Sequence, residues 1–179
     1  MKELKDCSKE ELLEMLADAA KNWLAHDGLW FQQVERALGM DKAIELDAAC
    51  WSKFSAIEAE RIMKRHNIQP GGGIPALVLA LGFRLYAYIN KQEILEATDK
   101  RCVFRMNTCR VQEARARKNL PAFPCKPVGI VEYTNFARTI DPRIKTRCII
   151  CPPDRTVVRA GPPDAHSPEC WCSWEFFIA

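Results

Sequence analysis

The sequence predicts an α+β fold in which N-terminal helices pack on a small antiparallel sheet of β-β-α-β-β order. Two observations predict this class. Apolar side chains recur at helical spacing in residues 1–90, whereas residues 91–179 contain short alternating runs typical of strands. Helices followed by a group of strands indicate helices packed on one face of an antiparallel sheet. We therefore expect a helical subdomain at 1–90 and a cysteine-rich subdomain at 91–179, integrated into one domain.

The helical half divides into three segments, which are 8–39, 41–66 and 75–90. Ser8, which precedes acidic residues, predicts the N-cap of the first helix, and Asp27-Gly28 is expected to bend that helix or divide it in two. Asp41 predicts the cap of the second helix. The third segment is interrupted by Gly82 and Arg84 and is shorter than the roughly 20 apolar residues that span a bilayer. We therefore expect a buried helix there, and no membrane.

The second half predicts four strands and one helix. The strands are expected at 93–97, 102–111, 144–151 and 170–178, and the helix at 128–139. Cys102 alternates with core-type residues along its strand, so we interpret it as structural, together with Cys7 and Cys50. The loop 152–169 is rich in Pro and Gly, and we expect it to be mobile.

Charge and composition narrow the class of protein. Residues 1–100 carry 13 basic and 16 acidic groups, whereas residues 101–179 carry 13 and 7. The basic excess of the second half is not interleaved with an aromatic stacking motif, so nucleic acid is an unlikely partner. The charged, amphipathic start does not resemble a secretory signal, and we expect a cytoplasmic protein. The sequence contains neither a phosphate-binding loop nor a G-x-S-x-G or H-E-x-x-H motif.

Seven of the nine cysteines follow residue 100, and this asymmetry is the main functional clue. Clustered thiols in a reducing compartment favour metal binding or redox chemistry over disulfides. We expect a subset of six cysteines to bind zinc, or alternatively an iron–sulfur cluster: Cys109, Cys125, Cys148, Cys151, Cys170 and Cys172. His166 is a possible substitute ligand. Redox-active thiols and simply buried cysteines are the alternative interpretations.

Strand parity limits how these thiols can combine. Residues three apart in a strand point to opposite faces, so Cys148 and Cys151 can act together only if their strand ends near Ile150, and Pro152 favours such an end. Cys125 precedes a predicted helix, whose N-terminus lowers the pKa of a thiol. We therefore regard Cys125 as the best candidate for a reactive thiolate.

Other polar residues could supply chemistry. His26 and Asp27 would place an imidazole beside a carboxylate for acid–base catalysis, or they are a surface histidine and a capping aspartate. The polar run that includes Arg110, Gln112 and Arg115 could clamp a ligand carboxylate, because arginine binds carboxylates bidentately. Glu132 and Tyr133, on the late helix, are expected to face either a ligand pocket or water.

The chain resembles small proteins related to L-2-amino-thiazoline-4-carboxylate hydrolases. The resemblance rests on His26-Asp27-Gly28-Leu29-Trp30, on the stretch 39–47, on the spacing of Cys109, Cys125 and Cys148, and on the final strand from Cys170. More distantly, the arrangement is similar to the vinyl-reductase-type ligand-binding domains. These resemblances imply a small-molecule pocket between helices and sheet, often in a homodimer. Cys151 and Cys172 are departures from the pattern.

Three functions follow as hypotheses. The first is a cytoplasmic metal-binding protein that binds a small organic ligand in its pocket. The second is a hydrolase of a small cyclic amidine or amide, with His26, Asp27 and Cys125 as candidate catalytic residues. The third is a zinc-stabilised interaction module without catalysis.

Overall fold

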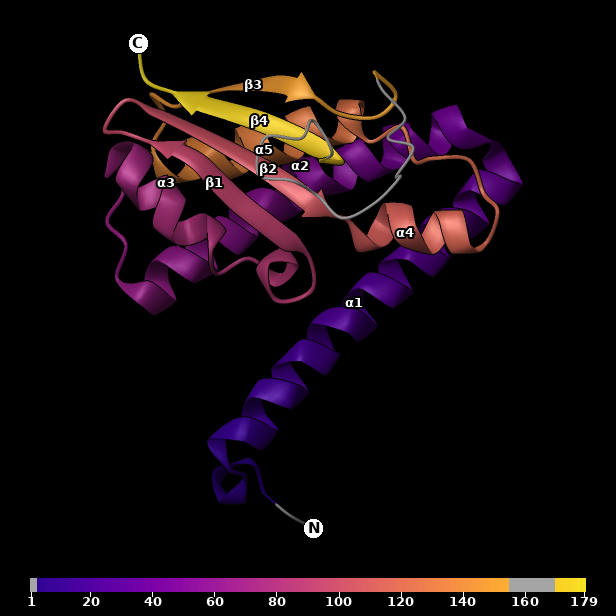
Figure 1. Cartoon of the computed structure of the whole chain (residues 1–179), viewed down its shortest axis with the longest axis horizontal. Helices are drawn as coiled ribbons and strands as arrows, with labels where there is room; N and C mark the ends of the chain where they lie inside the picture. Colours follow the sequence, from indigo (N-terminus) through magenta and orange to yellow (C-terminus); the bar gives the residue numbers. More distant parts are fainter. Residues whose placement is uncertain (1–2, 155–169) are drawn as a thin grey trace.

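The computed structural model describes residues 3–154 and 170–179. The elements in chain order are η1 (Leu4–Asp6), α1 (Lys9–Leu38), α2 (Met40–His66), α3 (Gly73–Leu81), η2 (Leu85–Tyr88), β1 (Lys91–Ala97), β2 (Arg101–Thr108), α4 (Arg110–Arg117), α5 (Lys126–Ile140), β3 (Lys145–Ile150) and β4 (Cys172–Phe177). The strands form one antiparallel sheet in the order β1-β2-β4-β3 (Figure 1). The α+β prediction is confirmed. Most of the loop predicted at 152–169, including His166, lies outside the described residues.

Helix α1 is one continuous helix, so Asp27-Gly28 does not divide it in two, which was one of the two expected outcomes. Its start is a capping box, in which the backbone N–H of Glu11 donates to the Ser8 hydroxyl at 3.2 Å while the Glu11 carboxylate accepts from the Ser8 N–H at 2.7 Å. A single glycine inside a helix costs only about 1 kcal/mol, which a 30-residue helix can absorb. The N-terminal half of α1 projects away from the rest of the molecule (Figure 1).

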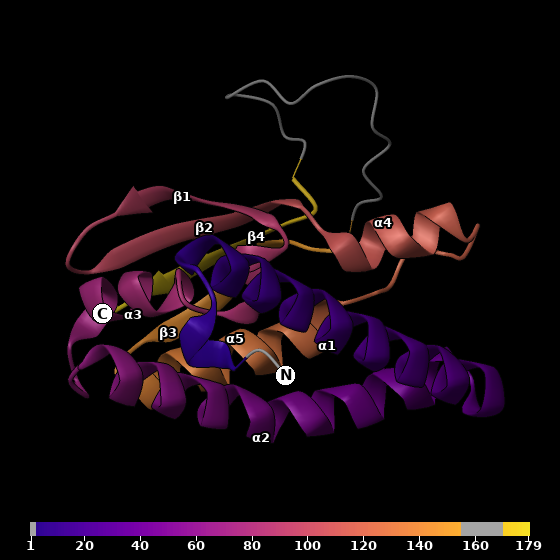
Figure 2. The same cartoon turned by 90° about the horizontal axis from the view of Figure 1, so that it is seen from below.

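Two left-handed residues bound helix α2. Gly39, with φ of +85°, ends α1 and precedes the first residue of α2, so the predicted cap at Asp41 lies two residues too late. Helix α2 ends at His66 as predicted, and Asn67 follows it with φ of 53°. The two long helices therefore meet at a tight turn and pack side by side (Figure 2).

The third predicted helix is shorter than expected. Helix α3 ends at Leu81, and the 3-10 turn η2 follows instead of a continuation to residue 90. The reason lies at Arg84, which is buried and ion-paired to Glu58 of α2 and Glu132 of α5. An arginine held by two other elements fixes the chain in a non-helical path at that point.

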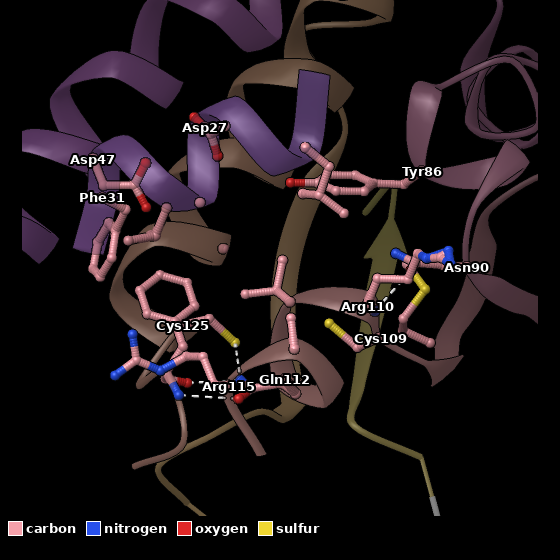
Figure 3. Close-up of a pocket in the computed structure, with 18 of the residues that line it drawn as sticks. Asp27, Phe31, Asp47, Tyr86, Asn90, Cys109, Arg110, Gln112, Arg115 and Cys125 are labelled. Atoms are coloured by element: carbon pink, nitrogen blue, oxygen red, sulfur yellow. Dashed lines mark hydrogen bonds between the residues drawn. The ribbon is translucent and has the colours of Figure 1, made fainter. Parts of the chain in front are cut away.

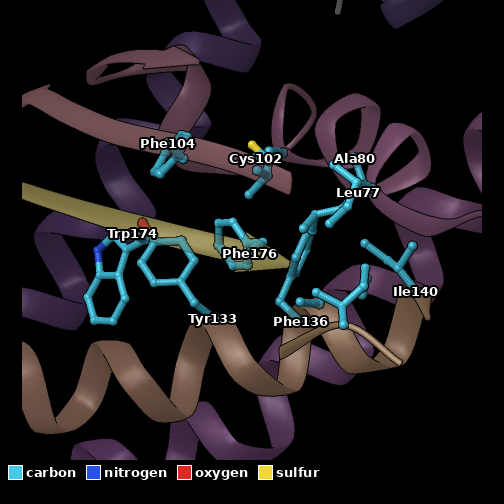
Figure 4. Close-up of a cluster of buried hydrophobic side chains, with 14 of the residues drawn as sticks. Leu77, Ala80, Cys102, Phe104, Tyr133, Phe136, Ile140, Trp174 and Phe176 are labelled. Atoms are coloured by element: carbon cyan, nitrogen blue, oxygen red, sulfur yellow. The ribbon is translucent and has the colours of Figure 1, made fainter. Parts of the chain in front are cut away.

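The core lies between the sheet and α5. Figure 2 shows α5 between the sheet and α2, so the molecule has three layers over this region. Large side chains from α5, β2, β4 and α3 fill the space, including Phe136, Phe104, Trp174, Phe176 and Leu77 (Figure 4). On β4, Trp174 and Phe176 face this core in strict alternation with Ser173 and Glu175. Among the described residues, no helix is long and apolar enough to cross a membrane.

Candidate functional site

A cavity of about 310 Å³ opens between the helices and one end of the sheet. Its walls come from α1, α2, α4, α5 and the residues around the strand ends (Figure 3). The side chains that carry chemistry on these walls are Lys21, Asp27, Asp47, Tyr86, Cys109, Arg110, Gln112, Arg115, Arg117, Lys118, Cys125, Glu132, Tyr133, Cys151 and Cys172. The pocket is thus bounded by carboxylates from the helical layer and by thiols at the end of the sheet.

The carboxylate wall is formed by Asp27 of α1 and Asp47 of α2. Burial raises the pKa of Asp47 to about 7, and the charges of Asp27 and Glu132 push it in the same direction, while a hydrogen bond from the Trp51 side chain opposes them. Burial likewise raises the pKa of Asp27, against the opposing effect of His26. The charge of Asp27 therefore disfavours the ionisation of Asp47, and a cation bound near Asp47 would relieve this.

Glu132 is ion-paired with a buried arginine, Arg84. The guanidinium of Arg84 lies 2.8 Å from the Glu58 carboxylate and 2.7 Å from that of Glu132, and its Nε donates to Glu58 at 2.9 Å. The same guanidinium lies 4.6 Å from the ring centroid of Phe136, and all three charged groups are buried. Burial still raises the pKa of Glu132, although Arg84 opposes the shift. Of this triad, Glu132 lines the pocket.

Helix α4 forms the opposite wall, and its polar residues bind the protein itself. Arg115 donates to both carboxylate oxygens of Glu35 in α1, at 2.7 and 2.8 Å, and to the carbonyl of Pro121 at 2.7 Å. Gln112 exchanges hydrogen bonds with the backbone of Phe123 at 2.7 and 3.0 Å. The bidentate clamp expected at Arg115 therefore exists, but the carboxylate it holds belongs to Glu35. Both side chains fix the wall and are not available to a ligand.

The antiparallel pairing of the strands brings several thiols together at one end of the sheet. Strand β4 pairs with β2 on one side and β3 on the other, so the start of β4 lies beside the ends of both neighbours. Cys109, Cys151 and Cys172 stand at these three positions. Cys125 joins them as the N-cap of α5, where the next residue, Lys126, donates its N–H to Pro152 at 2.9 Å and its ammonium lies 2.7 Å from the Asp154 carboxylate.

Cys151 is the centre of the cluster. Its sulfur lies 3.0 Å from that of Cys125 and is hydrogen-bonded to the thiols of Cys148 and Cys172 as well. The register of β3 on β4 shifts between Cys148 and Ile150, and this bulge overcomes the parity that would otherwise separate Cys148 from Cys151. Cys151 is fully buried, whereas Cys148 is half-buried.

The thiols differ in how readily they ionise. The hydrogen bond from Cys151 lowers the pKa of Cys148, and the charge of Lys126 acts in the same direction. Hydrogen bonding to the neighbouring thiols raises the pKa of Cys151, and burial raises the pKa of Cys109. The cluster therefore combines a half-buried thiol that ionises easily with a buried one that does not.

This arrangement does not resemble a metal cage. In a tetrahedral zinc site, sulfurs about 2.3 Å from the ion lie about 3.8 Å from one another around an open centre. Here the sulfur of Cys151 itself occupies the middle. Within residues 3–154 and 170–179, no group of three or more His, Cys, Asp or Glu side chains is placed to hold a metal ion. The zinc or iron–sulfur centre stays a prediction.

The predicted site residues divide into those at the pocket and those elsewhere. Asp27, Arg110, Gln112, Arg115 and Glu132 line it, as do four of the six candidate thiols, whereas His26 is exposed and absent from its walls. Tyr133 touches the pocket but is buried in the aromatic core, 4.8 Å from the ring of Trp174. Cys170 is buried just before β4.

One expectation about the cysteines is wrong, and two residues were missed. Cys50 is exposed on α2, so it is not part of the core, whereas Cys102 is fully buried as predicted. Asp47 was not singled out, although its helical spacing places it four residues before Trp51 on the buried face of α2. Arg84 was noted only as an interruption, although an arginine inside an apolar run is a signal for a buried ion pair.

Comparison with known families gives one match. A family model described as a family of unknown function, DUF6125, matches residues 5–178. No curated protein and no solved structure matches the chain. The resemblance to the thiazoline carboxylate hydrolases therefore stays a prediction.

Proposed function

This chain belongs to the DUF6125 family, and we propose that it binds a small organic cation in the pocket between its helices and its sheet. The observation that carries the proposal is the pair of carboxyl groups, Asp27 and Asp47, on the wall of an otherwise mainly apolar cavity. Small-molecule sites are largely apolar, with a few convergent polar groups that fix orientation.

The size and charge of the pocket define the ligand class. A volume of about 310 Å³ is at the lower end of the range of about 300–1,000 Å³ found for small-molecule sites. Five basic residues also line the pocket, which are Lys21, Arg110, Arg115, Arg117 and Lys118. Three of them are held by the protein itself, because Lys21 pairs with Asp18, Arg115 pairs with Glu35 and Lys118 donates to Gln32. A protonated amine or amidine attached to a small ring fits both the apolar walls and the carboxylate pair.

Three probes of the same shape test this proposal. Benzamidine is a cation, benzamide is neutral and benzoate is an anion, and all three carry the same phenyl ring. We expect benzamidine to bind with at least tenfold lower Kd than benzamide, measured by isothermal titration calorimetry at pH 8, and benzoate to show no binding. Asp47→Asn should reduce the preference for benzamidine over benzamide at least fivefold, and Asp27→Asn should do the same.

The matched control is Asp41→Asn, because Asp41 is exposed on the same helix as Asp47 and lies outside the pocket walls. It should leave all three affinities unchanged. Equal binding of benzamidine and benzamide by the unmodified protein would contradict the proposal, as would an equal effect of Asp41→Asn and Asp47→Asn.

Hydrolysis of a small cyclic amidine or amide is the second candidate function. It is favoured by the pKa of Asp47, which is about 7, because a carboxyl group that titrates near neutral pH serves well as a general base for an attacking water. Ring-opening of a panel of cyclic amidines, followed by mass spectrometry, tests this function. Turnover that survives Asp47→Asn unchanged would exclude the proposed base.

The proposed setting is the cytoplasm, where reduced cysteines persist. We propose that a second copy of the chain is the partner. Leu12, Leu13, Met15 and Leu16 on the projecting half of α1 are each 39–55% exposed. A two-fold dimer would cover this face on both chains at once. Sedimentation should show a dimer that Leu12→Lys with Leu16→Lys dissociates, and a monomer at all concentrations would exclude it.

A further inference from the structure

The thiol cluster includes residues of the same pocket as the carboxylate wall, and it has chemistry of its own. We propose that Cys148, Cys151 and Cys125 form a thiol–disulfide exchange site that reduces small organic disulfides. The proposal rests on the contact of the Cys125 and Cys151 sulfurs at 3.0 Å, on the bulge that brings Cys148 onto the same hub, and on the difference in exposure between Cys148 and Cys151.

The geometry favours thiol–disulfide exchange because two of the sulfur atoms need to move only a short distance to form a disulfide bond. A disulfide bond is about 2.05 Å long, so the sulfurs of Cys125 and Cys151 need to approach by only about 1 Å. The backbone holds them together from both sides. Lys126, next to Cys125, binds the carbonyl of Pro152, next to Cys151, and its ammonium pairs with Asp154.

Cys148 is the entry point of the site. It is half-buried, whereas Cys151 has no exposed surface. The Cys151 thiol donates to its sulfur and Lys126 supplies positive charge near it, and these two neighbours lower the pKa of Cys148 against the opposing effects of burial and the Asp154 carboxylate. The thiolate is the form of cysteine that attacks a disulfide.

The reaction balances in two steps. The Cys148 thiolate attacks one sulfur of a disulfide R–S–S–R, which forms a mixed disulfide and releases RS⁻. Cys151 then gives its proton to the released thiolate and attacks the Cys148 sulfur, which expels the second RS⁻. Two protein thiols are thereby oxidised by two electrons, and the disulfide is reduced to two thiols. Cys125 can exchange with the new bond and move it to the Cys125–Cys151 pair.

The test uses the reduced full-length chain and bis(2-hydroxyethyl) disulfide as the probe. The background variant is Cys50→Ser with Cys7→Ser, because Cys50 is exposed and Cys7 half-exposed, and neither belongs to the cluster. Acid-quenched samples are alkylated and analysed by intact mass and peptide mapping. We expect two fewer alkyl groups per chain than in the fully reduced control, and a loss of about 2 Da, the mass of two hydrogens, in samples that are not alkylated. Peptide mapping should place Cys151 in the disulfide that forms.

Two variants separate the roles. Cys148→Ser should slow the reaction at least tenfold. Cys151→Ala should react at Cys148 and stop there, so that the mixed disulfide with the probe accumulates. Because Cys151 is buried, circular dichroism must show that Cys151→Ala is folded; if it is not, the mapping of the disulfide in the background variant decides.

Each outcome decides between interpretations. A disulfide that does not include Cys151 would overturn the proposal, as would cluster thiols that react no faster than Cys50 does in the unmodified chain. One zinc ion per chain that blocks the reaction until a chelator removes it would also overturn it, and would make the cluster a metal centre instead. None of these outcomes depends on the binding of cations by Asp27 and Asp47, so the two proposals can fail separately.

Discussion

Gly129 of α5 lies directly against the indole of Trp174 in β4. A Cβ atom on Gly129 would come within 2.7 Å of Cζ2 and 2.9 Å of Cη2 of a ring that has no exposed surface. The absence of a side chain at Gly129 therefore sets how closely α5 approaches the sheet. It also fixes one wall of the pocket, because both residues line it.

The first prediction is that Gly129→Ala destabilises the fold. The added methyl group must displace a ring in a packed core, which costs about 1–3 kcal/mol. The free energy of unfolding, measured by urea denaturation, should fall by that amount. Gly28→Ala is the matched control, because its Cβ would meet no atom within 4 Å in the middle of α1. It should be neutral or stabilising by up to about 1 kcal/mol, and a loss of stability equal to that of Gly129→Ala would contradict the argument.

The second prediction concerns the buried ion triad. Arg84→Met removes the cation shared by Glu58 and Glu132 and leaves two buried carboxyl groups without it. Breaking a buried ion pair from one side typically costs about 3–5 kcal/mol. Urea denaturation at pH 7 should show a loss of that size.

The control for the triad is Arg65→Met, on the exposed last turn of α2, which should change stability by less than about 0.5 kcal/mol. Adding Glu58→Gln and Glu132→Gln to Arg84→Met should recover part of the loss, because the buried charges are then removed together. If this triple variant were less stable than Arg84→Met alone, charge would not be the cause.

These two relationships show where sequence reasoning succeeded and where it failed. Local periodicity and turn residues determine where the two long helices end, at Gly39 and His66, so these ends were predictable. The order of the strands along the chain was predictable for the same reason. Helix α4 was not predicted: its first two residues fell in the strand expected at 102–111 and the rest was assigned to no element, because its polar sequence has no apolar periodicity. Its position depends on distant contacts such as Arg115 with Glu35. The partners of Arg84 lie 26 and 48 positions away, beyond any local pattern.

The thiol cluster was predictable in part. Cys148 and Cys151 stand at the end of one predicted strand, and Cys172 stands at the start of the next. Antiparallel pairing of these two strands would bring the three cysteines near one another. The choice of Cys151 as the hub depends on a bulge between Cys148 and Ile150, and nothing in the residues themselves specifies it. Asp47 was missed because its significance comes from Asp27 and Glu132, which lie on two other helices.

The third prediction concerns acid stability and Asp141. Hydrogen bonds from Arg143 hold the pKa of this buried carboxylate at about 2, and the N–H of Gly73 donates to it at 3.0 Å. Because the folded pKa lies below the unfolded value of about 3.9, the stabilisation is present above pH 4 and is lost as the pH falls toward 2. Asp141→Asn should therefore lower the free energy of unfolding by about 1–2 kcal/mol at pH 6 and by much less at pH 2.

The acid control is Glu60→Gln, at an exposed position of α2. It should leave the pH dependence of stability unchanged. A difference between Asp141→Asn and the unmodified chain that stays constant from pH 6 to pH 2 would show that the Asp141 charge is not responsible.

The fourth prediction has the opposite sign and concerns Asp47. Its pKa in the folded chain is about 7, above the unfolded value of about 3.9, so the folded state binds more protons than the unfolded state between these two values. Stability of the unmodified chain should therefore fall as the pH rises from 4 to 7. Asp47→Asn removes this dependence and keeps an oxygen to accept the hydrogen bond from Trp51. We expect the variant to be more stable by about 1–3 kcal/mol at pH 8 and nearly equal to the unmodified chain at pH 4, measured by urea denaturation. A gap that narrows with rising pH would mean that a cation within the protein already neutralises Asp47, and the pocket would then have no unmet charge to offer a ligand.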